Sequence, residues 1–293
     1  MLVVIAVGIA VLALPAGATA KKHKKAKGLG PVVTVTATGN SVSGSGSVST
    51  AVATCPSGTV VFGGGFSAPL LSGSTAIAVF ESYRSAPGSW TASALRLGGS
   101  GAAASVAYCR RSSRPIADVT ATGAVPSGTA KTGSATATCP SGTRLVAGGF
   151  QSSRGPGTAA LAVPWTNMAS GSSWSLVSAN NSSGAQTITA HAYCLAGIRA
   201  PTVVSSQRLS SVAQYQTLTA TTPVCPAPKK KGKKKKKPRQ RLSAGGFSTP
   251  IPAASPLAVF DSSMEASSAW AATASNASGP TGSISITSQG ICV

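Results

Sequence analysis

The chain has 293 residues, with 25 lysines and arginines against only four aspartates and glutamates, so its formal net charge is +21. General acid–base catalysis needs ionisable groups in pairs, and four carboxylates with two histidines argue against an enzyme. The length suits two or three domains of ordinary size.

The first twenty residues predict a secretory signal peptide. Residues 2–14 form an uninterrupted run of apolar residues and glycine, and the small residues Ala18, Thr19 and Ala20 precede Lys21. The run is shorter than the roughly 20 residues that span a bilayer, and its flanks are typical of cleavage after Ala20. No lysine or arginine precedes it, which departs from the usual pattern. We therefore expect residues 1–20 to direct the protein to an oxidising, extracytoplasmic compartment, with association at the cell surface.

A basic tail follows at residues 21–31. Its second half, residues 28–31, has the glycine and proline content of a linker. A run of like charges next to such a linker predicts a solvated segment. The lysines of the tail are Lys21, Lys22, Lys24, Lys25 and Lys27.

From residue 32 onward the sequence predicts antiparallel β structure. Short stretches of Val, Thr, Ala and Ile alternate with serine and are broken about every eight to twelve residues by Gly, Pro, Asn or Ser. Helical periodicity is absent, and the density of glycine and β-branched residues disfavours helices. In the first part of the chain we expect strands at 33–38, 48–55, 59–67, 75–83, 89–97 and 102–110.

The same sequence module occurs three times in the chain. Each copy has a cysteine and a turn, then Gly-Gly-Phe, a tryptophan and a second cysteine. From the first copy to the second, every landmark up to the tryptophan shifts by 84 positions, as from Cys55 to Cys139. The fixed shift predicts tandem units of about 85 residues at 32–114, 115–200 and 201–293. We expect each to be a disulfide-closed antiparallel β-sandwich or barrel, with joints at Pro115 and Pro201 short enough to favour contact between neighbours.

The six cysteines fall as one pair per repeat, and a bridge would stabilise each small unit by roughly 4 kcal/mol. No pair has the spacing of about two to four residues that places two thiolates on one zinc ion, so we expect no metal. Other connectivities of six cysteines stay open. The simplest pairing joins Cys55 to Cys109, Cys139 to Cys194, and Cys225 to Cys292.

Each repeat carries one tryptophan and one Gly-Gly-Phe phenylalanine that we expect in the core. An apolar residue two positions after each tryptophan places its ring on the inner face of a strand. Trp165 has no counterpart in the other copies and is the ring we expect to be exposed. Exposed aromatic rings stack on sugars, so a carbohydrate-binding or adhesive module is the alternative function. The recurring rings are Trp90, Trp174, Trp270, Phe66, Phe150 and Phe247.

No candidate catalytic group recurs in all three copies. Glu81 and Asp261 each follow Ala-Val-Phe, but an alignment without gaps puts Trp165 at that place in the second copy. His191 aligns with valine and glutamine, which predicts a partly buried histidine on a strand. No Gly-x-Ser-x-Gly turn is paired with a histidine and a carboxylate. We therefore expect no catalytic residues and no cofactor, and a hydrolase with one idiosyncratic site is the third alternative.

The third copy carries a lysine-rich insertion in its first hairpin, over residues 226–241. Eleven residues are added where the other copies have Pro-Ser-Gly, and the repeat resumes at Arg241-Leu242. Its cations are Lys229, Lys230, Lys231, Lys233, Lys234, Lys235, Lys236, Lys237, Arg239 and Arg241.

The tail and this loop carry most of the positive charge and predict contact with polyanions. Clustered lysines attract any polyanion through their long-range field and through counterion release. Anionic cell-wall polymer, polysaccharide, nucleic acid and an anionic membrane surface all fit. The segments lack aromatic residues to stack bases, so we expect no sequence-specific nucleic-acid binding. The alternative is a solvated loop without a partner.

The motif string resembles a repeat of secreted bacterial proteins of uncharacterised function. It consists of Cys-Pro-Ser-Gly-Thr, Gly-Gly-Phe, a tryptophan and Ala-Tyr-Cys, and it covers residues 33–293. The third copy departs from it, because it ends Gly290-Ile291-Cys292 and carries the insertion. The resemblance implies an extracytoplasmic β module and brings no catalytic residues. We expect a secreted, non-catalytic, envelope-associated protein; whether its repeats pack together, and its oligomeric state, stay open.

Overall fold

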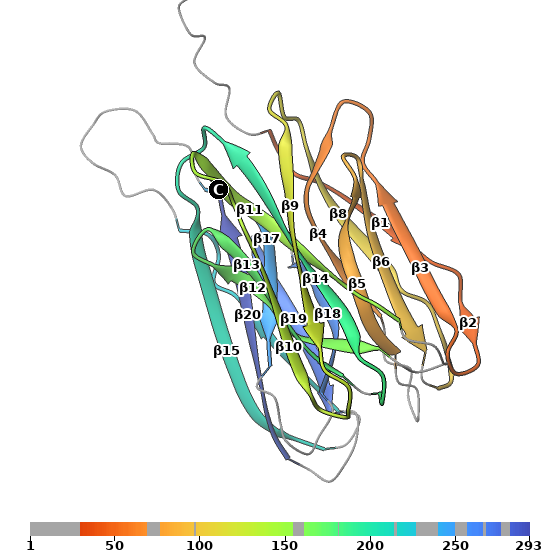
Figure 1. The fold of residues 1–293 in the computed structure, drawn as a ribbon. Coiled ribbons are helices and arrows are strands. Elements are labelled where there is room, and N and C mark those ends of the chain that lie inside the picture. The colour runs from red at the N-terminus through yellow and green to blue at the C-terminus, as the bar shows by residue number, and fades with distance from the viewer. Residues whose placement is uncertain are drawn as a thin grey trace, which may run out of the picture.

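The computed structural model of the protein describes residues 30–68, 77–96, 98–154, 161–180, 182–213, 216–226, 240–249, 257–265, 268–276 and 282–293. Over these ranges the regular structure consists of β-strands (Figure 1). The all-β prediction is therefore confirmed. Within these ranges, no helix is long and apolar enough to cross a membrane. The signal peptide predicted at 1–20 and the lysines of the tail lie outside the described residues.

The strands follow the repeat. Repeat 1 holds β1 (Val33–Thr38), β2 (Val42–Ser43), β3 (Val48–Thr54), β4 (Val60–Ser67), β5 (Ile77–Ala86), β6 (Ser89–Arg96), β7 (Ser100–Gly101) and β8 (Ala104–Arg110). Repeat 2 holds β9 (Ile116–Val125), β10 (Thr132–Thr138), β11 (Thr143–Ser152), β12 (Ala162–Ser170), β13 (Ser173–Asn180) and β14 (Gln186–Ala196). Repeat 3 holds β15 (Thr202–Val212), β16 (Thr217–Thr221), β17 (Leu242–Ser248), β18 (Leu257–Glu265), β19 (Ala269–Asn276) and β20 (Gly282–Cys292). All six strands expected in repeat 1 are present; only the short pair β2 and β7 was not predicted.

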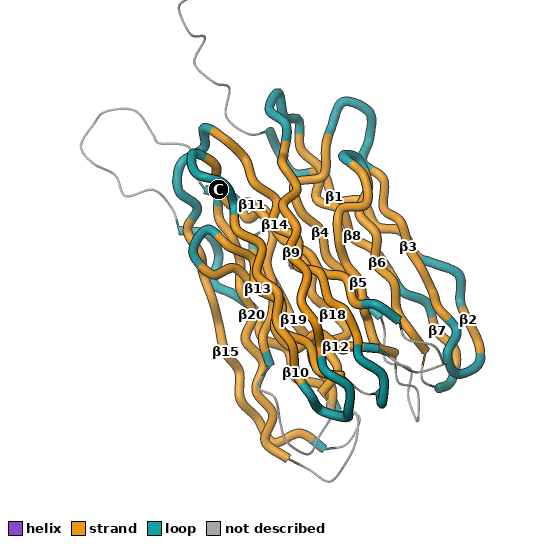
Figure 2. Tube along the Cα trace, viewed as in Figure 1, coloured by secondary structure: helices purple, strands orange, loops and turns teal. Residues whose placement is uncertain are grey.

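Each repeat is a small sandwich, but its two sheets do not stop at its boundary. Three six-stranded sheets have the orders β1-β8-β4-β18-β19-β16, β3-β6-β5-β11-β14-β9 and β10-β13-β12-β17-β20-β15. Each sheet takes three strands from one repeat and three from another. The joints are β4 with β18, β5 with β11, and β12 with β17, so repeat 1 joins repeat 3, repeat 2 joins repeat 1 and repeat 3 joins repeat 2. The cyclic sharing of sheets therefore joins the repeats into one body with pseudo-threefold symmetry. Its strands run side by side along a common direction (Figures 1 and 2).

The three Gly-Gly-Phe phenylalanines meet where the repeats converge. Phe66, Phe150 and Phe247 are buried and contact one another edge to face, with ring centroids 5.8, 6.0 and 6.3 Å apart. Such T-shaped contacts add to the stabilisation from apolar burial. The prediction that these rings belong to the core is confirmed, and the core they form is common to all three repeats.

The first glycine of each Gly-Gly-Phe lies flat against the tryptophan of its own repeat. An added Cβ at Gly64, Gly148 or Gly245 would overlap the indole ring. Each indole Nε1–H donates across the sheet, to the hydroxyl of Ser82 or Ser262 at 2.9 Å and to the amide oxygen of Asn167 at 2.6 Å. Trp90, Trp174 and Trp270 are buried, as predicted.

The second glycine of each motif serves the joint between repeats. An added Cβ at Gly65, Gly149 or Gly246 would collide with the backbone of the strand across the joint. Glycine is the residue that allows such close backbone approach within a strand. The Gly-Gly pair thus accommodates a ring on one side and a neighbouring repeat on the other.

Trp165 was expected to be exposed, and this prediction is wrong: the side chain is 6% exposed. It is the bulged residue of β12, where the register shifts between Pro164 and Thr166. The bulges of β5 and β18 hold Phe80 and Phe260 at the same place. Trp165 therefore replaces a phenylalanine of the other repeats; it is buried like Phe80, whereas Phe260 is partly buried.

The alignment without gaps failed here because two length changes cancel. The residue that accepts the hydrogen bond of the indole precedes the tryptophan by eight positions in repeat 1, from Ser82 to Trp90. In repeat 2 the corresponding residue, Asn167, precedes Trp174 by only seven. Repeat 2 has one residue more before the bulge and one fewer in the hairpin. A constant shift of 84 therefore hides a local slip of one residue.

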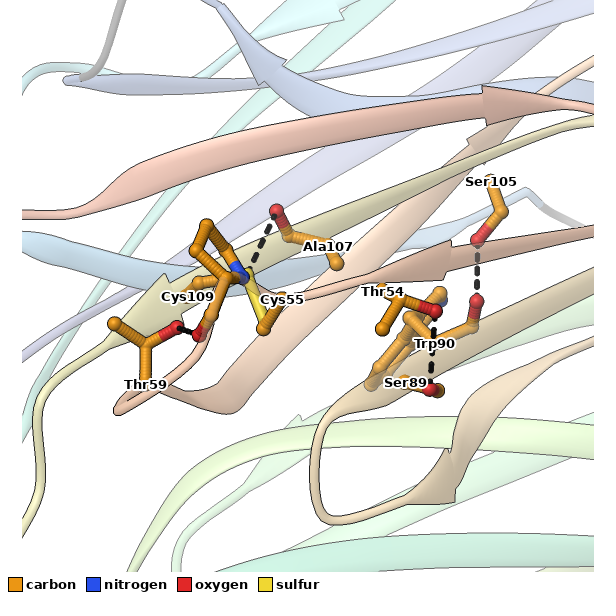
Figure 3. Close-up of a disulfide and its surroundings, with 9 residues drawn as sticks. Thr54, Cys55, Thr59, Ser89, Trp90, Ser105, Ala107 and Cys109 are labelled. Carbon is orange, nitrogen blue, oxygen red and sulfur yellow. Dashed lines mark hydrogen bonds between the residues drawn. A yellow bond between two sulfur atoms is a disulfide. The ribbon is translucent and has the colours of Figure 1, made fainter.

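The disulfides join each first hairpin to the last strand of its own repeat. Cys55 bonds Cys109, Cys139 bonds Cys194 and Cys225 bonds Cys292, with Cα atoms 5.6, 5.6 and 5.7 Å apart. The simplest pairing is thus confirmed, and Figure 3 shows the first bridge close to Trp90. All three bridges lie at one end of the strands, together with the connections between repeats. We call this the cysteine end.

Candidate functional site

The cysteine end gathers arginines from all three repeats. They lie at strand ends near a cysteine or in the connections between repeats, and Asp118 and Glu265 are the acidic residues described at this end. A surface with an excess of one sign of charge attracts ligands of the other sign. The arginines are Arg84, Arg110, Arg111, Arg114, Arg144, Arg199 and Arg241.

Arg110 ties this end together. Its side chain is 1% exposed, its Nη2 donates a hydrogen bond of 2.7 Å to the Leu242 carbonyl, and its guanidinium lies 5.7 Å from the centre of the Phe62 ring. Burial, and to a smaller extent repulsion from Arg241, lowers the pKa of Arg110 to about 10. The group is therefore still a cation at neutral pH. It anchors the base of the lysine-rich loop, at Arg241-Leu242, to the last strand of repeat 1.

The two lysine-rich segments leave from neighbouring points of the cysteine end. β1 begins beside Cys109, with Val33 paired to it, and Gly30 lies against Arg111. The loop is anchored at Cys225 by its disulfide and at Arg241, which exchanges two backbone hydrogen bonds of 2.9 Å with Val293. Figure 2 shows the C-terminus at this end of the molecule. Both anchors therefore adjoin Arg110 and Arg111.

Most of the predicted contact residues lie outside the described part of the chain. This holds for the five tail lysines, the eight loop lysines and Arg239, whereas Arg241 is described. The structure thus fixes where the two segments are attached. The arginine cluster at their attachment points was missed in the sequence, because its members come from different repeats and are far apart in the chain.

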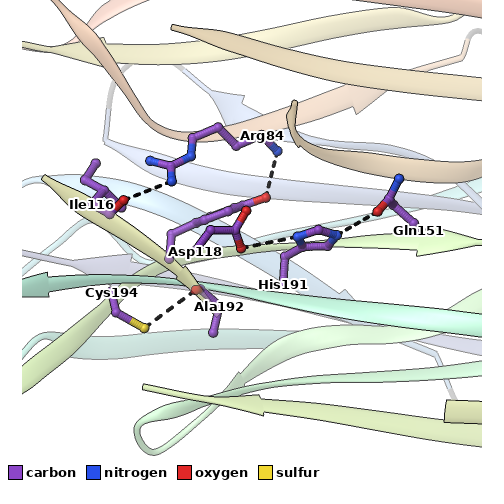
Figure 4. Close-up of polar contacts among 8 residues, drawn as sticks. Arg84, Ile116, Asp118, Gln151, His191, Ala192 and Cys194 are labelled. Atoms are coloured by element: carbon purple, nitrogen blue, oxygen red, sulfur yellow. Dashed lines mark hydrogen bonds and ion pairs between the residues drawn. The ribbon is translucent and has the colours of Figure 1, made fainter. Parts of the chain in front are cut away.

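A polar cluster surrounds His191 on β14 (Figure 4). The ring is 6% exposed; Nδ1 lies 3.3 Å from a carboxylate oxygen of Asp118, and Nε2 lies 2.9 Å from the amide oxygen of Gln151. Tyr83 stacks on the ring with centroids 5.3 Å apart. The prediction of a buried histidine on a strand is confirmed. Its partners are a carboxylate and an amide, and their positions do not recur in the other repeats.

Tryptophan stacking on sugars finds no support in the geometry. Trp90, Trp165, Trp174 and Trp270 are all buried. A ring that stacks on a pyranose must present a face to solvent, which none of the four does.

Among the described residues, no three His, Cys, Asp or Glu side chains lie close enough together to hold a metal ion. The six cysteines are all consumed by the disulfides. No protein-family model matches the chain, and no curated protein matches it in sequence.

The carboxyl group of Asp261 provides a test of electrostatics in the core. Burial raises its pKa above the ordinary value, against the hydrogen bond of 2.9 Å donated by the Ser263 hydroxyl. A carboxyl whose pKa is raised in the folded state opposes folding at neutral pH, and this penalty disappears as the pH falls through the folded pKa. We expect Asp261→Asn to raise the free energy of unfolding at pH 7, with the gain diminishing as the pH falls through the folded pKa of Asp261.

Thermal melts of both proteins between pH 4 and pH 7 would measure this difference. Glu81→Gln, at the corresponding position of repeat 1, is the matched control. A difference between Asp261→Asn and the native protein that grows towards low pH would contradict the assigned direction.

Proposed function

We propose that the protein is a secreted, non-catalytic protein that binds anionic polymers at the cell envelope through the lysine-rich tail and loop. The observation that carries the proposal is the attachment of both segments to the same arginine-rich end of a rigid body. The three disulfides fit an oxidising, extracytoplasmic environment.

The physical basis is electrostatic and not specific to one sequence or sugar. The loop carries ten cations and the tail five, and they extend from a surface that is itself positive. Each phosphate, sulfate or carboxylate neutralised by a lysine releases a condensed counterion, so affinity falls steeply as salt rises. The ligands that fit are cell-wall polymers, acidic polysaccharides, nucleic acid without sequence preference, and anionic lipid surfaces.

The test uses the repeat as its own template. Replacing residues 226–240 by Pro-Ser-Gly-Thr, the turn of repeat 2, converts the third hairpin into a copy of the second, which keeps Cys225 and Arg241 in place. We expect binding to a polyanion such as heparin at low salt to weaken roughly 100-fold or more. Removal of residues 21–27 should weaken it further, and the melting temperature should stay unchanged in both variants.

Titrations at several salt concentrations would measure these effects. The dependence of log affinity on log salt should become shallower in step with the number of lysines removed. Unchanged polyanion affinity in the variant that lacks both segments would refute the proposal. Retention of binding to a neutral glycan in that variant would instead favour a carbohydrate-binding module.

A further inference from the structure

Two of the three joints between repeats are filled by a tyrosine. Tyr193 reaches from repeat 2 to repeat 1, where its hydroxyl accepts a hydrogen bond of 2.7 Å from the Arg84 backbone N–H. Tyr108 reaches from repeat 1 to repeat 3 and accepts one from the backbone N–H of Met264. Each ring lies edge-on to the tryptophan of the repeat it enters, at 5.6 Å. Both tyrosines are fully buried.

The third joint, between repeats 2 and 3, lacks this ring. Ile291 occupies the register position of the two tyrosines, and Ala169 corresponds to Arg84 and Met264. The backbone group that a tyrosine hydroxyl would have bound is satisfied in another way. Gln289 accepts from the Ala169 N–H at 2.6 Å and donates to the Ala169 carbonyl at 3.1 Å. Gln289 thus replaces the hydrogen bond of the tyrosine hydroxyl, but the smaller Ile291 does not replace the volume of the tyrosine ring.

A pocket of about 140 Å³ is present at this joint. Its apolar wall consists of Leu145, Ala169 and Ile291, which are almost completely buried. Arg144 and Val203 form its exposed rim. The pocket therefore has a deep apolar side and an open side that carries a cation.

The joint between repeats 1 and 2 shows what fills the corresponding space there. The Arg84 side chain lies over the Tyr193 ring, with its guanidinium carbon 5.0 Å from the ring centre. Its Nη2 donates a hydrogen bond of 3.0 Å to the Ile116 carbonyl (Figure 4). In the third joint both members of this pair are replaced by smaller side chains, Ala169 and Ile291. The pocket lies beside these two smaller side chains, since Ala169 and Ile291 both line it.

We propose that this pocket binds a small aromatic carboxylate, with a single six-membered ring against Ile291 and Ala169 and the carboxylate on Arg144. An apolar cavity of about 150 Å³ accepts a benzene ring, so the volume fits. The side chain of Arg144 makes no hydrogen bond or ion pair with any described residue, and a guanidinium binds a carboxylate through paired, charge-assisted hydrogen bonds. None of the residues that line the pocket belongs to the tail or the loop, and its ligand is a small molecule instead of a polymer.

The test is a titration of the full-length secreted protein with benzoate, followed by the NMR signal of the Ile291 δ1 methyl group. A bound ring should shift this signal in a saturable way, whereas acetate, which has the charge without the ring, should not. Ala169→Met places at this joint the side chain that Met264 provides at another, and Ile291→Tyr restores the missing ring. We expect each to weaken benzoate binding at least ~10-fold, which corresponds to about 1.4 kcal/mol.

Arg144→Gln should weaken benzoate binding by about 10-fold and leave phenol binding unchanged. Arg111→Gln, an exposed arginine outside the pocket at the same end, is the matched control for loss of one charge. Two blocking variants keep the test decisive if one of them fails to fold. Benzoate that binds no better than acetate, or that binds both blocking variants as well as the native protein, would overturn the proposal. Binding of a tyrosine-containing peptide without any binding of benzoate would likewise overturn it, in favour of a protein partner.

Discussion

Gly148→Ala is expected to destabilise the protein by about 3 kcal/mol, at the upper end of what a single added methyl group costs in a packed core. The Cβ would overlap the indole of Trp174, which is completely buried and held by its hydrogen bond to Asn167. The ring cannot move aside without breaking that bond and displacing the strand beneath it. Urea denaturation followed by tryptophan fluorescence would measure the loss.

The matched control is Gly184→Ala in the same repeat, where an added Cβ meets no atom within 4 Å and the backbone is not in the left-handed region. It should change stability by less than about 0.5 kcal/mol. If Gly148→Ala lowered the free energy of unfolding as little as this control, the close packing of the first motif glycine against the tryptophan ring would be wrong. Gly64→Ala and Gly245→Ala should behave like Gly148→Ala, since each faces its own tryptophan.

The strands, the disulfides and the buried repeat aromatics could be predicted because each depends on chemistry inside one repeat. Alternation of apolar and serine residues marks a half-buried strand wherever it occurs. One cysteine pair per copy favours closure within the copy, and the bridges of all three copies follow it. A tryptophan followed two residues later by an apolar side chain faces the core for the same local reason.

The sharing of sheets between repeats could not be predicted, because strand pairing uses backbone hydrogen bonds that every residue except proline offers. The joints are short, with two paired residues each, such as Phe150 with Ser82 and Gln151 with Glu81. The one sequence signal is the second motif glycine, whose role as a point of close approach is ambiguous without a partner strand. The burial of Trp165 was missed for another reason. Repeat 2 has one extra residue before the bulge and one fewer in the hairpin, and the two changes cancel in length.

For the candidate site, composition located the lysine-rich segments, whereas their convergence depends on tertiary structure. Arg110 and Leu242 are 132 residues apart in sequence and in contact in space. The pocket at the third joint was also hidden. The sequence shows Gly290-Ile291-Cys292 in place of Ala-Tyr-Cys, but only the fold reveals that the tyrosine fills a joint with another repeat.

Phe150→Ala is expected to cost about 3 to 5 kcal/mol and to destabilise all three repeats together. The Phe150 ring is completely buried and contacts both Phe66 and Phe247, so its removal leaves a cavity on the pseudo-threefold axis. Because each of the three six-stranded sheets passes from one repeat into another, a repeat that opens exposes strand edges and core of its two neighbours. Native-state hydrogen exchange resolves the three repeats separately, and protection of the slowest amides should fall equally in β8, β14 and β20.

The contrast with independent domains makes this result decisive. In a string of separate units, Phe150→Ala would lower protection in repeat 2 alone, and denaturation would show two transitions. Val52→Ala, on the exposed face of β3, is the control for a substitution within one repeat and should change stability by less than about 0.5 kcal/mol. Loss of protection confined to β14 would show that the joints contribute little. Equal loss would show that the pairings between repeats make three small, alanine-rich units into one cooperative fold.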